Sequence, residues 1–166
     1  MADGLRLYSG AFNHKDFISV EVKVDVGLAL SDPEQEPFFL APDCSDADLG
    51  DALQKAFAGF RVIAPELEEA RTIYKRVFEY GESGKWATDL MARFGYKRKG
   101  QLYKRLHYCF IDSFEGIITI SPTNHDQPDG WSGLGESEKV RIPDTSTPEE
   151  IGAALRLGFS RCWGKY

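Results

Sequence analysis

His125 comes nearest to a catalytic group in this sequence. It stands in the segment Thr123–Asp126, which is predicted to be a loop, with Trp131 nearby. A histidine beside a carboxylate can act as a general base, but it also needs a partner within hydrogen-bond reach and a substrate pocket. The sequence shows neither, and His107 falls inside a predicted strand, where it is interpreted as a structural residue. An enzyme that uses the His125 loop is therefore the minor hypothesis.

Other catalytic and cofactor motifs are missing from the sequence. It has no phosphate-binding loop, no dinucleotide glycine pattern, no nucleophile elbow and no metal-binding H-E-x-x-H. Cys44, Cys109 and Cys162 are far apart and form no C-x-x-C pair or cysteine–histidine cluster. An odd number at such spacing favours buried thiols in a reducing compartment. We expect no catalytic residues, no metal and no other cofactor.

The composition is that of one folded domain, which we expect to span residues 1–166. Hydrophobic residues make up 42% of the chain and charged residues 28%, which is typical of a globular protein. The first eight residues lack the apolar core of a secretory signal, and no apolar run is long enough to cross a membrane. These features predict a protein that stays in the cytoplasm and does not bind a membrane.

The formal net charge of −6 argues against nucleic acid as a direct partner, because binding to phosphates depends on clustered lysine and arginine. One basic run, residues 97–105, interrupts the acidic composition. An acidic surface suits a basic protein partner, whose complementary field speeds the encounter. A solvated surface without a partner is the alternative explanation.

The hydrophobic pattern predicts an α/β (α+β) fold, a mixed sheet with helices packed on it. Phe17–Val26 alternates between apolar and polar residues, which is typical of a half-buried strand. Glu115-Gly116 fits the turn of a hairpin. Residues 122–136 are predicted to lack an element, and Gly81 and Gly84 to separate two helices. The remaining predicted strands are 38–41, 102–112, 116–121 and 140–142, and the predicted helices begin near residues 45, 65, 86 and 148.

Two segments about a hundred residues apart resemble each other. Phe39–Asp43 matches Val140–Asp144, and the following helices match with one extra residue in the second copy. Both helices carry a glycine, Gly50 and Gly152, although a glycine inside a helix costs about 1 kcal/mol relative to alanine. We expect a pseudo-symmetric domain with a duplicated strand–helix unit, in which each glycine lets the backbone approach the sheet or the other helix.

The second copy, together with the middle of the chain, resembles a bacterial protein family. It is similar to the CdiI-type immunity proteins of contact-dependent growth inhibition systems, from about Phe39 to Cys162. The residues that carry the resemblance are Val140–Pro143, Ser146–Leu157 and Phe159–Cys162, with Trp86, Phe94–Lys97, Leu102–Lys104, Cys109, Ser121-Pro122, Trp131 and Gly133.

The resemblance implies a cytoplasmic antidote that binds and neutralises the C-terminal toxin domain of a CdiA-type effector. Such toxins are often nucleases, and an inhibitor that covers a basic nuclease surface needs no catalytic residues of its own. We expect the protein to be a monomer or a weak homodimer. The expected toxin-binding residues are acidic or aromatic and lie outside the repeated segments: Glu66, Glu68, Glu69, Asp126, Asp129, Trp131, Glu136 and Glu138.

Overall fold

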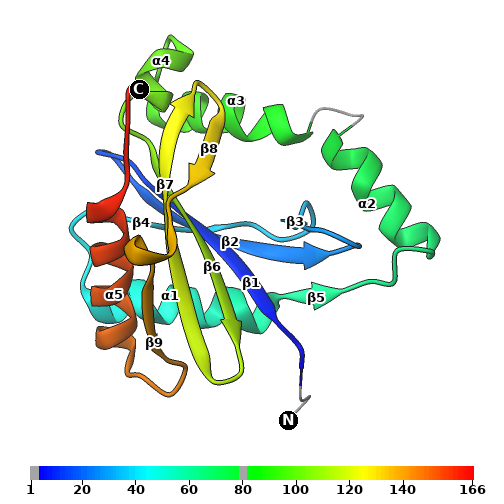
Figure 1. Ribbon diagram of the computed structural model, residues 1–166. Helices are drawn as coiled ribbons and strands as arrows, with labels where there is room; N and C mark the ends of the chain where they lie inside the picture. The colour runs from blue at the N-terminus through cyan, green and yellow to red at the C-terminus, as the bar shows by residue number, and fades with distance from the viewer. Residues whose placement is uncertain (1–3, 79–81) are drawn as a thin grey trace.

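The computed structural model describes residues 4–78 and 82–166 (Figure 1). Its elements in chain order are β1 (Leu7–Asn13), β2 (Ile18–Asp25), β3 (Ala29–Ser31), β4 (Phe38–Leu40), α1 (Asp46–Gly59), β5 (Arg61–Val62), α2 (Glu68–Phe78), α3 (Glu82–Phe94), α4 (Lys99–Tyr103), β6 (His107–Phe114), β7 (Ile117–Gln127), β8 (Gly130–Gly133), η1 (Glu136–Glu138), β9 (Val140–Pro143), α5 (Pro148–Arg161) and β10 (Trp163–Gly164). The ten strands of the described residues form one sheet, with the central order β10-β7-β6-β1-β2-β3. The sheet is mixed, because β5 pairs with β2 and β10 pairs with β7 in parallel.

Local chemistry explains why several elements begin and end where the sequence predicts. The side chain of Ser45 accepts the backbone N–H of Asp48 at 3.0 Å and caps α1. Thr147 caps α5 in the same way, within a reciprocal capping box. Glu115 and Gly116 have positive φ angles of 49° and 78°, as a two-residue hairpin turn between β6 and β7 requires.

Some boundaries differ from the predicted ones. The sequence predicts a strand from Leu102, but residues 99–103 form α4, and β6 begins at His107. The apolar residues that suggest a strand here, Leu102 and Leu106, are instead fully buried in α4 and in the turn after it. Residues 122–136, predicted to have no element, contain the end of β7 and all of β8, which pair as a hairpin.

The sequence also gives no sign of β1 or β3. The apolar and polar residues of β1 do not alternate, and β3 has only three residues. Gly84 does not interrupt a helix, since it lies in the first turn of α3. Gly81, the other glycine predicted to separate two helices, lies outside the described residues.

The duplicated unit extends over nearly the whole sheet. Ser9 pairs with Val22, and Cys109 pairs with Pro122, each 100 positions later. After the second strand the offset is 102, since Ile18 pairs with Leu40 and Ile118 with Ile142. The sequence matches Pro42-Asp43 with Pro143-Asp144, which are 101 positions apart, so that match is shifted by one residue from the structural one. The two extra residues of the second copy lie before β9. Each half ends with a helix and a short strand parallel to its second strand.

The two equivalent helices, α1 and α5, pack against each other on one face of the sheet (Figure 1). A Cβ atom on Gly50 would lie 1.9 Å from the carbonyl oxygen of Pro148, and one on Gly152 would lie 1.9 Å from that of Asp46. The repeated glycines therefore let the two helix backbones touch, which confirms that a close approach explains them. The main hydrophobic core lies between these helices and the sheet, around Val20, Ile120 and other fully buried side chains.

The other face of the sheet is covered by the segment that joins the two halves. Helices α3 and α4 pack over an aromatic cluster that includes Phe12, Phe17 and Tyr108. Helix α2 lies beyond the end of β2 and packs over a separate group that includes Val24, Leu30 and Ile73, on the side of the strand that also carries Val20 and Val22. The polar side of β2, predicted to face solvent, is therefore buried at Ser19 and Glu21. None of the described helices is long and apolar enough to cross a membrane.

Candidate functional site

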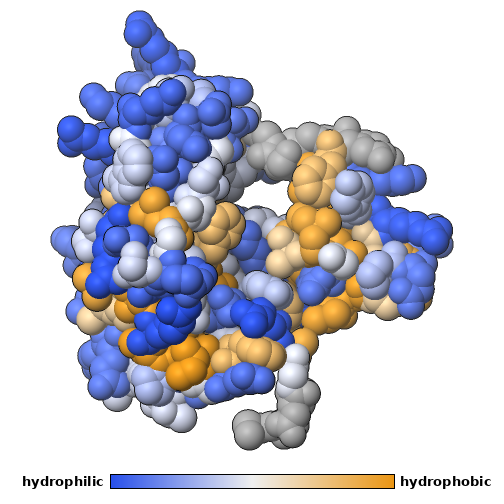
Figure 2. Space-filling model, viewed as in Figure 1, coloured by the Kyte–Doolittle hydropathy of each residue, from blue (hydrophilic) through white to orange (hydrophobic). Residues whose placement is uncertain are grey.

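A pocket of about 610 Å³ lies on the second face of the sheet, which α3 and α4 cover, and the C-terminal end of α2 borders it. We call it the sheet pocket. Residues of β1, β2, β3, α2, α3, α4 and β8 line it, so it depends on parts of the chain that are far apart in sequence. Figure 2 shows a hollow at this position, between the body of the sheet and α2. Two other hollows on the surface are smaller, at about 400 and 220 Å³.

The floor of the sheet pocket carries a buried ion pair from β2. Alternation along the strand sends Val20 and Val22 to the main core and Glu21 and Lys23 to this face. Glu21 Oε2 contacts Lys23 Nζ at 2.8 Å and accepts a hydrogen bond from Tyr108 Oη at 2.9 Å, while Glu21 Oε1 accepts one from Ser31 Oγ at 2.7 Å. All of these partners favour the charged form of Glu21.

The titration of these groups follows from their surroundings. Burial disfavours the charge of Glu21, but Lys23 and the hydrogen bonds hold the pKa of its carboxyl below the usual range. Burial and the neighbouring carboxylate raise the pKa of Tyr108 well above its ordinary value. Gly10 leaves the space for this arrangement, since a Cβ atom there would lie 2.0 Å from Tyr108 Oη and 2.6 Å from Glu21 Oε2. The floor is therefore a fixed, charged surface.

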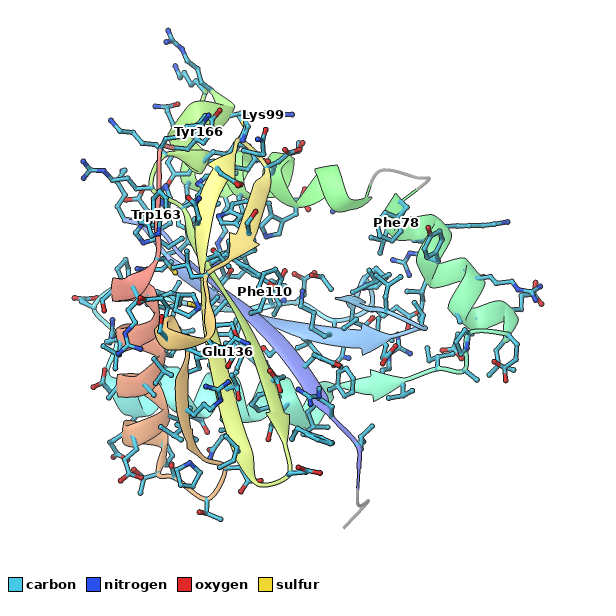
Figure 3. All side chains as sticks on the ribbon, viewed as in Figure 1. Phe78, Lys99, Phe110, Glu136, Trp163 and Tyr166 are labelled. Carbon is cyan, nitrogen blue, oxygen red and sulfur yellow. The ribbon has the colours of Figure 1, made fainter. Side chains whose placement is uncertain are left out.

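One wall of the pocket is aromatic. The ring of Phe12 lies 4.7 Å from the ring of Trp86 and 5.3 Å from the ring of Trp131, centroid to centroid. Trp131 Nε1 donates to the carbonyl oxygen of Leu106 at 2.9 Å, which fixes its orientation. Phe78, at the end of α2, is 52% exposed and borders the pocket from the opposite side (Figure 3). Such aromatic surfaces are the usual anchors of protein interfaces.

An arginine network holds the position of α2 beside the pocket. Arg61, in β5, contacts both oxygens of buried Asp32, at 2.7 and 3.0 Å, and also pairs with Glu34 and Glu69. Burial opposes the charge of Asp32, but the hydrogen bonds from Arg61 and Gln35 hold the pKa of Asp32 below its usual range. The loop after β3 and the start of α2 are thereby joined through one guanidinium group.

The opposite border of the pocket is basic. Lys99 and Tyr103 of α4 line the pocket, and four more basic residues lie next to them in sequence. Gln101 Oε1 accepts the backbone N–H groups of Lys97 and Arg98, at 2.8 and 3.1 Å, and fixes the turn into α4. The five exposed basic residues, which we call the α4 basic rim, are Lys97, Arg98, Lys99, Lys104 and Arg105.

The structure divides the predicted binding residues among three places. Asp126, Asp129 and Trp131 lie together on the β7–β8 hairpin, and two of them, Asp129 and Trp131, line the sheet pocket. The other five do not line it. Three of these, Glu66, Glu68 and Glu69, lie at or just before the start of α2, and Glu136 and Glu138 lie in η1. Figure 3 shows Glu136 well separated from Phe78 and Lys99.

Sequence reasoning missed most of the pocket residues. Phe12, Glu21, Lys23 and Trp86 carry no motif, and the alternation of β2 indicates only which side chains share a face. Helices α2, α3 and α4 begin 43, 57 and 74 residues after the end of β2, so no local signal shows that the polar face of β2 is enclosed. Trp131 was detectable as an aromatic residue among turn-forming residues, in a segment where apolar side chains are scarce.

The histidines have structural surroundings. The ring of His125 is 1% exposed, stacks on Trp131 at 4.6 Å and lies 3.0 Å from the carbonyl oxygen of Pro128 through Nε2. It belongs to a β-hairpin and does not line the sheet pocket. Burial and the nearby His125 lower the pKa of His107. The described residues contain no group of three or more His, Cys, Asp or Glu side chains arranged to hold a metal ion.

The cysteines are free thiols. Cys109 and Cys162 are buried with their sulfur atoms 3.6 Å apart, and Cys44 is partly exposed.

Comparison with known proteins identifies the family. A family model described as CDI immunity protein (CdiI) matches residues 11–162. The chain is 34% identical to immunity protein CdiI-YPIII of Yersinia pseudotuberculosis serotype O:3 (strain YPIII), over 90% of this chain and 91% of that protein.

Two solved structures have the same fold. A CdiA-CT/CdiI toxin and immunity complex from Yersinia pseudotuberculosis matches with a TM-score of 0.81 and 30% identity, over 96% of this chain and 99% of the matched chain. A protein of unknown function from Neisseria meningitidis matches with a TM-score of 0.90 and 23% identity, over 98% of each chain, and supports the fold alone. This chain belongs to the CdiI family of CDI immunity proteins, which is not a family of enzymes.

Proposed function

We propose that this chain neutralises the C-terminal toxin domain of a CdiA-type effector by binding it through the sheet pocket. The related Yersinia pseudotuberculosis structure is a complex of a toxin with its immunity protein, which supports a toxin as the partner. The observation that carries the proposal is the sheet pocket itself, a large concavity with rigid aromatic side chains on one wall and a charged floor. Concave, mostly apolar sites with a few fixed polar groups are typical binding sites.

The pocket is suited to an inserted segment of another protein. Phe12, Trp86 and Trp131 are packed against one another, so they lose little conformational freedom when a partner covers them. Phe78 is exposed opposite them and would be buried by a segment that enters the pocket. We propose a one-to-one complex in the cytoplasm, without nucleic acid, between the toxin and a chain that is otherwise a monomer or weak homodimer. A nuclease toxin, as the resemblance implies, is part of this proposal.

Two of the residues expected from sequence, Asp129 and Trp131, are proposed as contacts because they line the pocket. The others stay predictions: they would touch the toxin only if the interface extends beyond the pocket. Asp126 is the nearest of them, on the same hairpin, where it accepts a hydrogen bond from Ser132 Oγ at 3.1 Å. Glu66, Glu68, Glu69, Glu136 and Glu138 would require a larger interface.

Calorimetry with the purified toxin domain of the effector encoded beside this chain's gene tests the proposal. The variant Phe78→Arg places a charge at the mouth of the pocket, and we expect it to weaken binding at least tenfold, as for other interface anchors. Leu157→Arg is the matched control, since Leu157 is an exposed apolar residue of α5, on the other face of the sheet. We expect it to bind like the unmodified chain.

The two variants separate the possible outcomes. Absence of binding by the unmodified chain would refute the toxin partner. Equal binding by Phe78→Arg and Leu157→Arg would retain the partner and refute the pocket as its site. A growth assay, in which the chain is produced together with the toxin inside the same cells, checks that binding neutralises the toxin.

A further inference from the structure

The charges left unpaired near the sheet pocket are mostly basic, although the chain as a whole is acidic. Among the described residues, no ion pair joins any member of the α4 basic rim to a carboxylate. By contrast, most lysines and arginines elsewhere contact an acidic side chain. Five like charges within nine residues repel one another, so their grouping has an energetic cost that a partner of opposite charge would remove.

Several of the acidic residues are already neutralised within the chain. Glu69 pairs with Arg61 at 3.2 Å. Glu136 pairs with both Lys139 and Arg141, each at 2.5 Å, and these two contacts lower the pKa of its carboxyl. The net charge of −6 is a property of the whole chain and does not describe the electrostatic field at the pocket. Many acidic groups lie on other surfaces, and some are paired with a cation.

The interior of the pocket carries hydrogen-bond donors in excess. Trp86 lines the pocket, and its buried Nε1 has no acceptor among the described residues. The ammonium group of Lys23 has two partners, Glu21 and Ser31 Oγ at 3.3 Å, for its three hydrogens. The other buried polar atoms without partners, on Ser19, Asn124 and His125, belong to residues that do not line the pocket.

Among the described residues, few acidic groups oppose this pattern. Glu21 and Asp32 line the pocket, but both are held by internal cations. Asp129 is exposed at the border and has no ion pair among the described residues, and Asp126 lies on the same hairpin. Against these two carboxylates stand the five cations of the α4 basic rim.

We infer that the sheet pocket and the α4 basic rim recognise an acidic, acceptor-rich segment of the toxin. This inference rests on the proposed function and gives the partner segment a charge. Carbonyl or carboxylate oxygens of the segment accept the free hydrogen of Lys23 Nζ and, once the indole ring turns toward the pocket, that of Trp86 Nε1. The acidic side chains of the segment lie against the rim. A toxin that is basic where it grips nucleic acid would then be held through a region other than its phosphate-binding surface.

Association kinetics with the same toxin domain test the inference. The variant Lys97→Glu/Lys99→Glu reverses two rim charges before and at the start of α4, where acidic residues also favour the helix dipole. Arg71→Glu/Lys75→Glu makes the same change in net charge on exposed residues of α2 that do not line the sheet pocket. At low salt we expect the rim variant to associate at least tenfold more slowly than the control variant.

The dependence of the association rate on salt concentration shows whether the rim attracts or repels the toxin. Added salt should slow association of the unmodified chain and change that of the rim variant much less, because the variant rim holds Arg98, Lys104 and Arg105 against two glutamates and its field is nearly cancelled. Trp86→Phe removes the Nε1 donor and keeps an aromatic ring, and we expect about tenfold faster dissociation. Urea unfolding of each variant confirms that it is folded.

The outcomes remain distinct from those of the proposed function. If the unmodified chain binds the toxin and the rim and control variants associate equally fast, the inference is wrong and the proposed function stands. Faster association of the rim variant would show that the toxin segment is basic, as the acidic composition suggests. Retention of a labelled single-stranded RNA by the unmodified chain, lost in the rim variant, together with unchanged toxin kinetics, would assign the rim to nucleic acid instead.

Discussion

Replacing Gly152 by alanine tests the central feature of the fold, the direct contact of two helix backbones. The added Cβ would lie 1.9 Å from the carbonyl oxygen of Asp46, whereas such atoms essentially never approach below 3.0 Å. The gap must therefore open by at least about 1.1 Å. The obstructing atom belongs to a backbone, so no side-chain rotation relieves the clash, and α5 must move away from α1.

The magnitude follows from two opposing effects. Overfilling a packed core costs about 1–3 kcal/mol, and a rigid backbone neighbour places this site near the upper end, at about 3 kcal/mol. Alanine in place of glycine in a helix returns about 1 kcal/mol. We therefore expect Gly152→Ala to lower the free energy of unfolding by about 2 kcal/mol, which corresponds to a fall in Tm of roughly 4–8 °C for a chain of this size.

Urea unfolding followed by circular dichroism measures this change, with Gly100→Ala as the control. Gly100 is in α4, and a Cβ atom there would meet nothing within 4 Å. The control should be as stable as the unmodified chain or slightly more stable. The pseudo-symmetric variant Gly50→Ala should lose a similar amount, and the double variant less than the sum, since the first methyl group already separates the helices. A Gly152→Ala chain as stable as Gly100→Ala would refute the backbone-contact explanation.

Three further predictions concern the polar contacts of Arg156, His14 and Tyr108. Arg156→Lys should cost about 2 kcal/mol in urea unfolding, because a lysine cannot replace the guanidinium contacts to Asp46 and to two backbone carbonyls. Burial lowers the pKa of His14, so the unfolded chain binds a proton first as the pH falls. Stability should decline below about pH 6.5, by at most about 1.4 kcal/mol per pH unit for one proton, and His14→Gln should decline less steeply. Gly10→Ala should displace Tyr108 from the pocket floor and weaken toxin binding in calorimetry, and binding as tight as that of the unmodified chain would contradict it.

Local patterns in the sequence determined much of the fold. The alternation of β2, the caps Ser45 and Thr147 and the hairpin turn at Glu115-Gly116 are set by neighbouring residues, so they are visible without a structure. The repeated glycines are also visible in the sequence, and they indicate that each helix backbone comes close to the sheet or to the other helix. The resemblance that placed the chain among immunity proteins likewise depends on residue order and not on three-dimensional contacts.

Only the tertiary structure decided where the binding pocket lies and which charges surround it. The pocket forms because α3, α4 and the end of α2, from a distant part of the chain, enclose the polar face of β2. Net charge could not show that Glu69 and Glu136 are paired while the α4 basic rim is not, since pairing depends on separations of a few ångströms in space. Long-range contacts of this kind leave no periodic signal in a single sequence, because they join residues whose spacing along the chain is arbitrary.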